Sequence, residues 1–198
     1  MGRIAGFDLR WSTPISGLTV GTSLAYNPGK FSGTLGASPL TLSYSTTTNR
    51  VMAHYVDYTR GNFRADAEYR NQTRRGIITA EIPGRPVVFR PGSDEPAWFI
   101  SGAYRLSKRL EVGTYYSDYR VLLVNPPVAV TGPGRDHIFD KVISVRLDLA
   151  RFWDFKIEGH FMDGVGSPGQ AHGFYPQDNT NGLTPQTNML VIRTGWYF

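Results

Sequence analysis

Apolar and polar residues alternate one by one along much of the chain. In residues 62–70 the apolar Phe63, Ala65, Ala67 and Tyr69 take every second position, and the positions between them are charged. This period of two places the two kinds of side chain on opposite faces of a strand, whereas a helix would spread them around its circumference. The same alternation, with one or two exceptions in some stretches, occurs at residues 6–11, 18–26, 51–59, 97–106, 110–119, 143–149, 153–161 and 188–198. The pattern therefore predicts an all-β fold with about nine antiparallel strands.

The connections between these strands alternate between short and long. Tight links are expected at residues 13–17, 61–62, 107–108 and 151–153, and long outer loops near residues 28–49, 71–95, 120–136 and 165–187. Residues 39–46 also alternate, and we interpret them as a hairpin within a loop, because an extra spanning strand would put the next long loop on the short-turn side. Short turns on one side and long loops on the other are typical of an outer-membrane barrel.

Apolar residues are too dispersed to form a transmembrane helix, which needs a run of about 18. A barrel wall needs an apolar residue only at every second position, so the mean hydropathy of −0.28 is compatible with one. We therefore predict that residues 1–198 form a single, partial transmembrane antiparallel β-barrel domain in a bacterial outer membrane. Nine strands give the wrong parity for a closed antiparallel barrel, so we expect further strands upstream of Met1 and, with them, the export signal that is not visible here. Ten strands from this chain alone is the alternative.

The C-terminus carries the most specific local signal. Its last strand ends on an aromatic residue, with apolar residues at even spacing behind it: Leu190, Ile192, Trp196 and Phe198. This arrangement resembles the C-terminal signal that the barrel assembly machinery reads in outer-membrane proteins, so we expect that machinery as a partner. The alternative, a hydrophobic edge strand that ends a soluble domain, would invite aggregation.

If the alternation describes a barrel wall, its polar face lines the lumen. The candidate pore-lining residues are Arg10, Arg64, Asp66, Glu68, Arg70, Arg105, Glu111, Arg146, Asp148, Lys156, Glu158, His160 and Arg193, with Asp8 on the same face. Charges of both signs on neighbouring strands should pair across them and stiffen a hydrated wall. The excess of arginine also predicts a field that favours anions, and the two roles are compatible.

A second group of arginines lies in the long segment 71–95 and comprises Arg74, Arg75, Arg85 and Arg90. Folded into the barrel, this segment would narrow the pore and supply a cationic constriction. Folded outward, it would bind anionic lipopolysaccharide. The sequence leaves both arrangements open.

Other functional classes fit the residues poorly. The net charge of +5 is compatible with nucleic-acid binding, but the arginines share a face with carboxylates, which makes a poor track for phosphates. The absence of cysteine excludes disulfides, thiol nucleophiles and thiolate metal sites. Glu158 and His160 share a strand face, but Asp163 has the opposite parity, so we predict no metal site there. We expect no enzyme and no cofactor.

Three stretches of the sequence resemble a known family. They are VMAHYVDYTRGNFRADAEYRNQ, WFISGAYRLSKRLEVGTYYSDY and DKVISVRLDLARFWDFKIEGHFMDG, of which residues 156–164 are the most specific. They resemble the C-terminal half of porins in the phosphate-selective porin O and P group and its uncharacterised relatives. The resemblance implies a trimeric, water-filled barrel of about 16 to 18 strands. The lysines that give that group its phosphate selectivity have no match here, so this selectivity is not carried over.

The sequence thus predicts an outer-membrane porin for the passive diffusion of small hydrophilic solutes, with anions favoured by the arginines. Its expected surroundings are outer-membrane lipid and lipopolysaccharide, and the resemblance implies a homotrimer. The alternative is a non-conducting structural or adhesive barrel whose loops bind partners.

Overall fold

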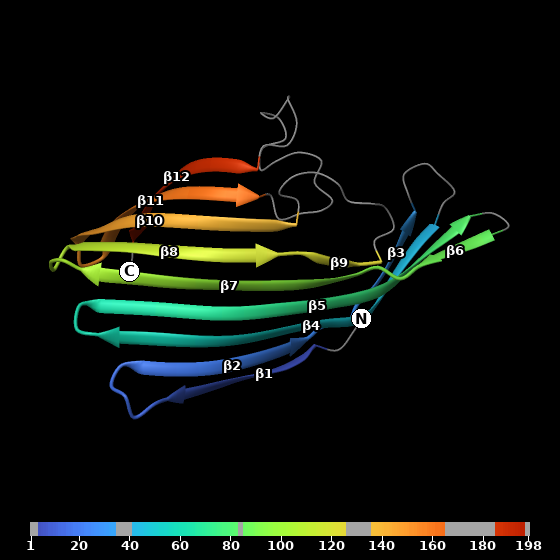
Figure 1. The fold of residues 1–198 in the computed structure, drawn as a ribbon, viewed down its shortest axis with the longest axis horizontal. Coiled ribbons are helices and arrows are strands. Elements are labelled where there is room, and N and C mark those ends of the chain that lie inside the picture. Colours follow the sequence, from blue (N-terminus) through green and yellow to red (C-terminus); the bar gives the residue numbers. More distant parts are fainter. Residues whose placement is uncertain (1–3, 35–40, 83–84, 126–135, 165–184, 197–198) are drawn as a thin grey trace.

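The computed structural model describes residues 4–34, 41–82, 85–125, 136–164 and 185–196, and these residues form one antiparallel β-sheet (Figure 1). Nine long strands follow one another across it: β1 (Ala5–Ser12), β2 (Leu18–Tyr26), β4 (Thr41–Arg60), β5 (Phe63–Ile82), β7 (Gly92–Arg105), β8 (Leu110–Arg120), β10 (His137–Ala150), β11 (Trp153–Gly164) and β12 (Gln186–Trp196). Three short strands pair with β4, β5 and β7, respectively, at the end of the sheet away from the tight links: β3 (Lys30–Thr34), β6 (Arg85–Phe89) and β9 (Leu122–Val124). The all-β fold and the nine-strand path confirm the sequence prediction.

The sheet is open. Each long strand pairs with the next one along the chain, from β1 at one edge to β12 at the other, and these two edges do not pair with each other. Because seven antiparallel strands lie between the edge strands, β1 and β12 run in the same direction. No helix in the described part of the chain is long and apolar enough to cross a membrane.

All the tight links lie at one end of the sheet, which we call the turn end (left in Figure 1). Glycine is required at two of them. Gly17 has a φ of +83°, and a Cβ there would collide with the carbonyl oxygen of Thr59. Gly61 has a φ of +58° in the link between β4 and β5. Only glycine adopts this left-handed conformation without strain.

The prediction of long loops at residues 28–49 and 71–95 is wrong. The strands β4 and β5 continue through these segments as 20-residue strands, and β3, β6 and the start of β7 pair with them. We call residues 41–49 and 71–95, with β3, β6 and β9, the strand extension. The hairpin expected at residues 39–46 is the pairing of β3 with the first residues of β4. Of the other two predicted loops, residues 126–135 and 165–184 lie outside the described residues.

The two faces of the sheet differ in composition, as the alternation predicts. One face, the outer face, presents apolar side chains that no other layer covers, such as Leu9, Ile143 and Leu190, which are 63%, 65% and 68% exposed. The other face, the inner face, carries most of the charged residues, although Asp118 and Lys141 have the parity of the outer face. Few apolar side chains are buried among the described residues, and Val142 is the most enclosed, at 1% exposure. The sheet therefore lacks the covered apolar face around which soluble domains are built.

Aromatic side chains gather near both ends of the outer face. Trp98 and Tyr116 lie 5.3 Å apart by ring centroids toward the strand extension. At the turn end Trp153 stacks on Trp196 at 4.6 Å with an angle of 8° between the rings.

Candidate functional site

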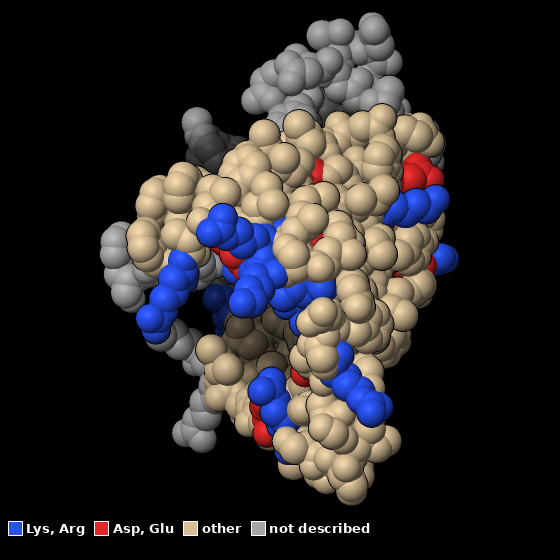
Figure 2. Space-filling view, turned by 90° about the vertical axis from the view of Figure 1, so that its left-hand side faces the viewer, with Lys and Arg blue, Asp and Glu red and all other residues tan. Residues whose placement is uncertain are grey.

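The strand register brings five of the predicted pore-lining residues into one row on the inner face. Successive direct pairings join Arg105, Glu111, Arg146, Lys156 and Arg193 on β7, β8, β10, β11 and β12. Directly opposite residues in an antiparallel sheet have Cβ atoms about 5 Å apart, so long side chains in a row readily reach their neighbours. Four cations and one carboxylate thus lie close together near the turn end. Figure 2, which looks at the turn end, shows Lys and Arg side chains gathered around the hollowed side of the sheet.

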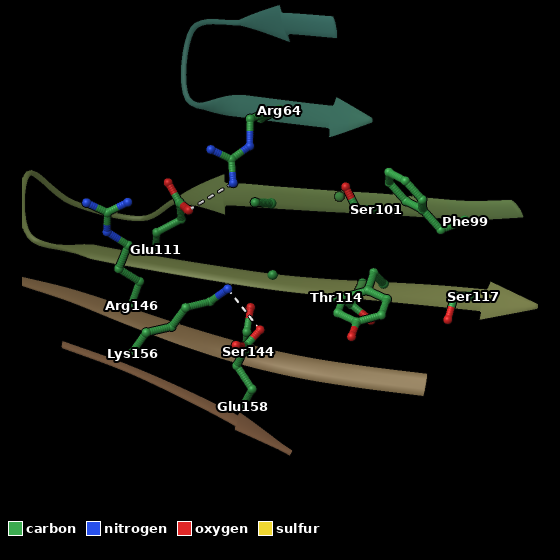
Figure 3. A pocket seen from close by; sticks show the side chains of 14 residues that line it. Arg64, Phe99, Ser101, Glu111, Thr114, Ser117, Ser144, Arg146, Lys156 and Glu158 are labelled. Atoms are coloured by element: carbon green, nitrogen blue, oxygen red, sulfur yellow. Dashed lines mark ion pairs between the residues drawn. The ribbon is translucent and has the colours of Figure 1, made fainter. Parts of the chain in front are cut away.

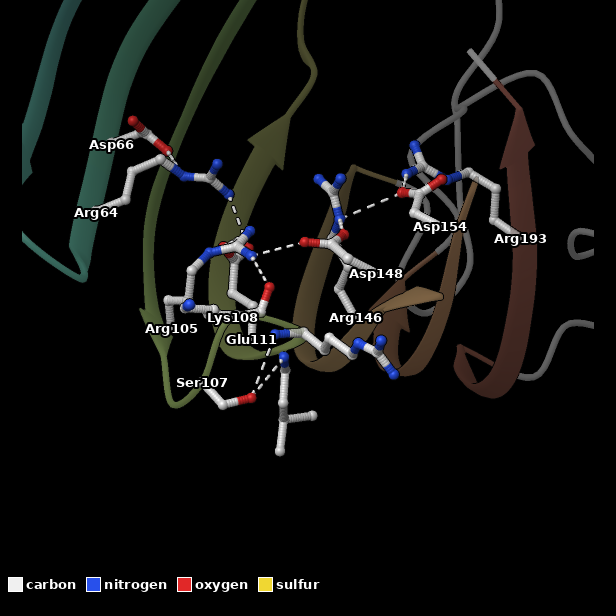
Figure 4. A network of polar contacts seen from close by, with 12 residues as sticks. Arg64, Asp66, Arg105, Ser107, Lys108, Glu111, Arg146, Asp148, Asp154 and Arg193 are labelled. Atoms are coloured by element: carbon white, nitrogen blue, oxygen red, sulfur yellow. Dashed lines mark hydrogen bonds and ion pairs between the residues drawn. The ribbon is translucent and has the colours of Figure 1, made fainter. Parts of the chain in front are cut away.

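Carboxylates from neighbouring positions link the three arginines of this row and Arg64 into an unbroken chain of alternating charge (Figure 4). Arg64 Nη2 lies 3.6 Å from Glu111 Oε1, and Arg105 bridges Glu111 at 3.2 Å and Asp148 at 2.6 Å. Arg146 Nε then joins Asp148 at 2.9 Å to Asp154 at 3.2 Å, and Arg193 Nη2 completes the chain at 2.7 Å from Asp154 Oδ2. We call this chain the charge ladder: Arg64, Glu111, Arg105, Asp148, Arg146, Asp154 and Arg193.

Asp154 is the residue of the charge ladder that the sequence analysis missed. It is 1% exposed and lies directly opposite Asp148 in the pairing of β10 with β11. Two carboxylates facing each other repel, and burial strengthens the repulsion. Arg146 contacts both of them, and Arg105 and Arg193 approach from either side. The parity of Asp154 matches that of Lys156 and would have placed it on the inner face, but its position next to the expected turn hid it.

Beside the charge ladder the inner face encloses a hollow of about 400 Å³ (Figure 3). Its charged lining residues are Arg64, Glu111, Arg146, Lys156 and Glu158, all of them predicted to line the pore. Lys156 Nζ pairs with Glu158 Oε1 at 2.8 Å. The side of the hollow away from the turn end is formed by Phe99, Tyr115 and the hydroxyls of Ser101 and Ser117.

Of the remaining predicted pore-lining residues, Asp66 borders the ladder, with its Oδ2 3.7 Å from Arg64 Nε, and the others lie on the inner face away from it. Arg10 Nε donates to Tyr55 Oη at 3.3 Å, and the Tyr55 hydroxyl donates to Asp8 at 3.2 Å. Ser101 Oγ donates to Asp66 at 3.1 Å. The register places Glu68 and Arg70 further along the same face of β5, nearer the extension.

His160 belongs to a small buried cluster. Its Nδ1 lies 2.8 Å from Asp140 Oδ2, which also accepts a hydrogen bond from Tyr115 Oη at 3.1 Å. Asp140 and Tyr115 were not among the predicted residues, because the alternation on β10 becomes clear only from Ile143 onward. In the described part of the chain no group of three His, Asp or Glu side chains is placed to hold a metal ion.

The four arginines predicted to act from a loop lie on or beside strands instead. Arg74 Nη2 lies 3.4 Å from the buried carboxylate of Glu95, and Arg75 Nη2 lies 2.7 Å from Asp94 Oδ2. The hydrogen bond from Arg75 holds the pKa of Asp94 below its ordinary value. Arg85 begins β6, and Arg90 directly follows it. Arg74 and Arg75 therefore brace the strand extension, and none of the four arginines occupies a long irregular loop.

The balance of charge on the inner face differs from the predicted excess of arginine. Between the turn end and the extension the register places seven cations there, namely Arg10, Arg64, Arg70, Arg105, Arg146, Lys156 and Arg193. The same face carries nine carboxylates: Asp8, Asp57, Asp66, Glu68, Glu111, Asp140, Asp148, Asp154 and Glu158. The predicted residues lacked Asp57, Asp140 and Asp154, and these three reverse the sign of the balance.

The C-terminal signal residues lie on the edge strand β12. Leu190, Ile192 and Trp196 are all more than half exposed on the outer face. Phe198 lies outside the described residues. A strand with one free edge and an exposed apolar face is a surface for pairing with another strand.

Comparison of the chain with protein-family models, with curated proteins and with solved structures finds no significant match. The proposal that follows therefore depends on the sheet and its side chains alone.

Proposed function

We propose that this chain forms part of the wall of an outer-membrane β-barrel channel for the passive diffusion of small hydrophilic solutes. The observation that carries the proposal is the contrast between the faces of one sheet. Its outer face exposes large apolar side chains on every long strand except β8, while charges on its inner face contact one another across six strands. A barrel in lipid needs this division, with apolar residues facing the acyl chains and polar residues facing the lumen.

The dimensions of the outer face support a membrane location. On β10 the outer-face positions from Phe139 to Leu149 are apolar apart from Lys141, which is next to Phe139 on that face, and the ten steps of about 3.4 Å between them give about 34 Å along the strand. A tilt of about 40° reduces this to about 26 Å, close to the roughly 25 Å apolar band of outer-membrane barrels. The aromatic groups around Trp98 and Trp153 lie at the two ends of this band, where girdles of aromatic residues meet the lipid headgroups. On this proposal the strand extension lies outside the membrane.

The open edges bear on how the barrel would close. Lipid offers no hydrogen-bond partners to the free backbone groups of β1 and β12, so further strands must pair with both edges. A barrel of about 16 to 18 strands would then enclose an aqueous lumen. Lipid and lipopolysaccharide would contact the outer face, and the homotrimer remains an expectation from the family resemblance.

The inner face gives no reason to expect strong selectivity for anions by the channel as a whole. Its carboxylates outnumber its cations, and nearly every ladder charge has a partner of opposite sign within 4 Å. We therefore propose that solutes of either charge enter, and that local groups of side chains set any preference.

Planar-bilayer recording tests this function. The complete barrel that contains this chain, assembled in outer membranes and purified from them in detergent, should give stepwise conductance when it is added to a bilayer. Insertion without conductance would favour the alternative of a structural or adhesive barrel. Failure to associate with membranes at all would overturn the proposal.

A further inference from the structure

The hollow beside the charge ladder has a local charge opposite to that of the inner face as a whole. Three cations and two carboxylates line it. The cations are also the more accessible groups: the side chains of Arg64, Arg146 and Lys156 are 52%, 30% and 30% exposed. Those of Glu111 and Glu158 are 16% and 19% exposed. A solute in the hollow therefore meets positive charge first.

The floor of the hollow is made of small residues. Ala103, Gly113 and Ser144 form a row of direct neighbours that runs between Arg64 and Glu158. A Cβ at position 113 would lie only 3.0 Å from Ser144 Oγ and 3.4 Å from Ala103 Cβ, so the floor is closely packed. The space above it exists because no longer side chain rises from these three positions.

Rigid groups surround this floor. Arg146 donates through Nε to Asp148 at 2.9 Å, which fixes its guanidinium in the ladder, and Figure 3 shows that guanidinium beside Glu111 at the rim of the hollow. Lys156 approaches from the neighbouring strand, and the ring of Phe99 forms part of the opposite wall. Cations lie on one side of the hollow and an aromatic surface on the other.

We propose that this hollow is a binding site for small organic carboxylates. The carboxylate group lies between Arg146 and Lys156, because a guanidinium held by one edge still presents donors that match a carboxylate. The apolar body lies over Ala103 and against Phe99. Inorganic phosphate would leave the apolar wall unused, and a neutral ring compound would leave the cations unused. The inference rests on the proposed channel function, for which it names a class of solute.

Binding can be measured separately from conductance. The full chain in detergent micelles is titrated with benzoate by calorimetry, and with phosphate and benzyl alcohol as matched probes that lack the ring or the charge. We expect benzoate to bind at least tenfold more tightly than either probe. Lys156→Gln should weaken benzoate binding about tenfold, the effect of one charged hydrogen bond, and leaves the charge ladder intact. Ala103→Leu fills the hollow without changing any charge and should abolish binding.

Arg10→Gln is the matched control, because Arg10 lies on the inner face far along the sheet from the hollow. It should leave benzoate binding unchanged. Equal affinity for phosphate and benzoate, or equal weakening of benzoate binding by Arg10→Gln and Lys156→Gln, would overturn the inference. Either result would mean that the overall electrostatic field of the inner face attracts anions without a specific site in the hollow. A channel that conducts but does not bind benzoate overturns the site and leaves the proposed function standing. A barrel that binds benzoate but does not conduct overturns the proposed function and leaves the binding site standing.

Discussion

On the inner face of β5 to β12, charged side chains contact one another in an unbroken chain, whereas the outer-face side chains of the same strands end in open space. The charge ladder joins seven residues through contacts of 2.6 to 3.6 Å. On the outer face Ile143 and Leu190 are about two-thirds exposed. Side-chain contacts across the inner face thus stabilise the sheet by themselves, while on our proposal the side chains of the outer face contact lipid. The two faces should therefore respond differently to the same kind of substitution.

The largest effect is expected where the ladder is most buried. Asp154→Ala leaves Arg146 and Arg193 without their shared carboxylate in a site of 1% exposure. Breaking a buried ion pair by removing one partner costs about 3–5 kcal/mol in the free energy of unfolding. Urea unfolding in detergent micelles measures this loss in the free energy of unfolding. Glu68→Ala, on the same face but outside the ladder, should change stability by about 0.5 kcal/mol or less, and an equal loss in both variants would contradict the role of the ladder.

The outer face provides the next largest effect and separates a lipid surface from a water surface. Ile143→Lys should destabilise the sheet in lipid bilayers by about 2–4 kcal/mol, because a charge at the midplane of a barrel wall is poorly solvated. The same substitution on a surface in contact with water would be nearly neutral. Thr19→Lys, on the inner face opposite Asp57, is the control and should be tolerated. A neutral Ile143→Lys would argue against the membrane proposal.

A smaller effect is expected at the turn end of the outer face. Trp153 stacks on Trp196 and donates from Nε1 to Thr194 Oγ1 at 2.7 Å. A double-mutant cycle of Trp153→Ala and Trp196→Ala should give a coupling of about 0.5–1.5 kcal/mol, the range for aromatic pairs. Trp153→Phe keeps an aromatic ring and should therefore retain part of this coupling free energy. A coupling near zero would mean that the two rings act separately, as interfacial groups alone.

The smallest effect concerns the strand extension, where both faces meet water on our proposal. Because Arg75 lowers the pKa of Asp94, the pair contributes stability above the ordinary aspartate pKa of about 4 and loses it as the pH falls through the lowered value. Hydrogen exchange in the paired segments of β5 and β7 should therefore accelerate in acid in the wild type. Asp94→Asn should already exchange faster at neutral pH and respond less to acid. Identical profiles for the two proteins would show that the pair does not brace the extension.

The sequence predicted the strands best where each face has one kind of residue. Period-two alternation is a local property, so it located the nine long strands and their tight links. The extension escaped because its strands carry Thr, Ser and Arg on both faces, as in residues 45–50 and 71–75. Hydrogen bonds to β3, β6 and β7 hold these segments, and such bonds leave no apolar pattern. The available signals were the alternation at residues 39–46, which we interpreted as a hairpin within a loop, and the run of β-branched residues from Thr46 to Thr48.

The site shows a similar division. Parity alone assigned Arg105, Arg146 and Lys156 to one face, and the structure places them in one row there. Which residues pair across strands depends on register, and parity does not determine register. Arg105 and Asp148, which form the shortest contact of the ladder, are 43 residues apart in the sequence. The sign of the total charge was wrong because it was judged before Asp57, Asp140 and Asp154 could be placed on a face.

The facing carboxylates of Asp148 and Asp154 affect the order in which the sheet can form. A hairpin of β10 and β11 alone would bring the two carboxylates together with only Arg146 between them. Arg105 arrives with β7 and Arg193 with β12, one from each side of the hairpin. The hairpin is therefore a weak nucleus by itself and gains stability only as its neighbours on both sides join. We therefore expect folding at the turn end to be cooperative across the six strands that carry the ladder.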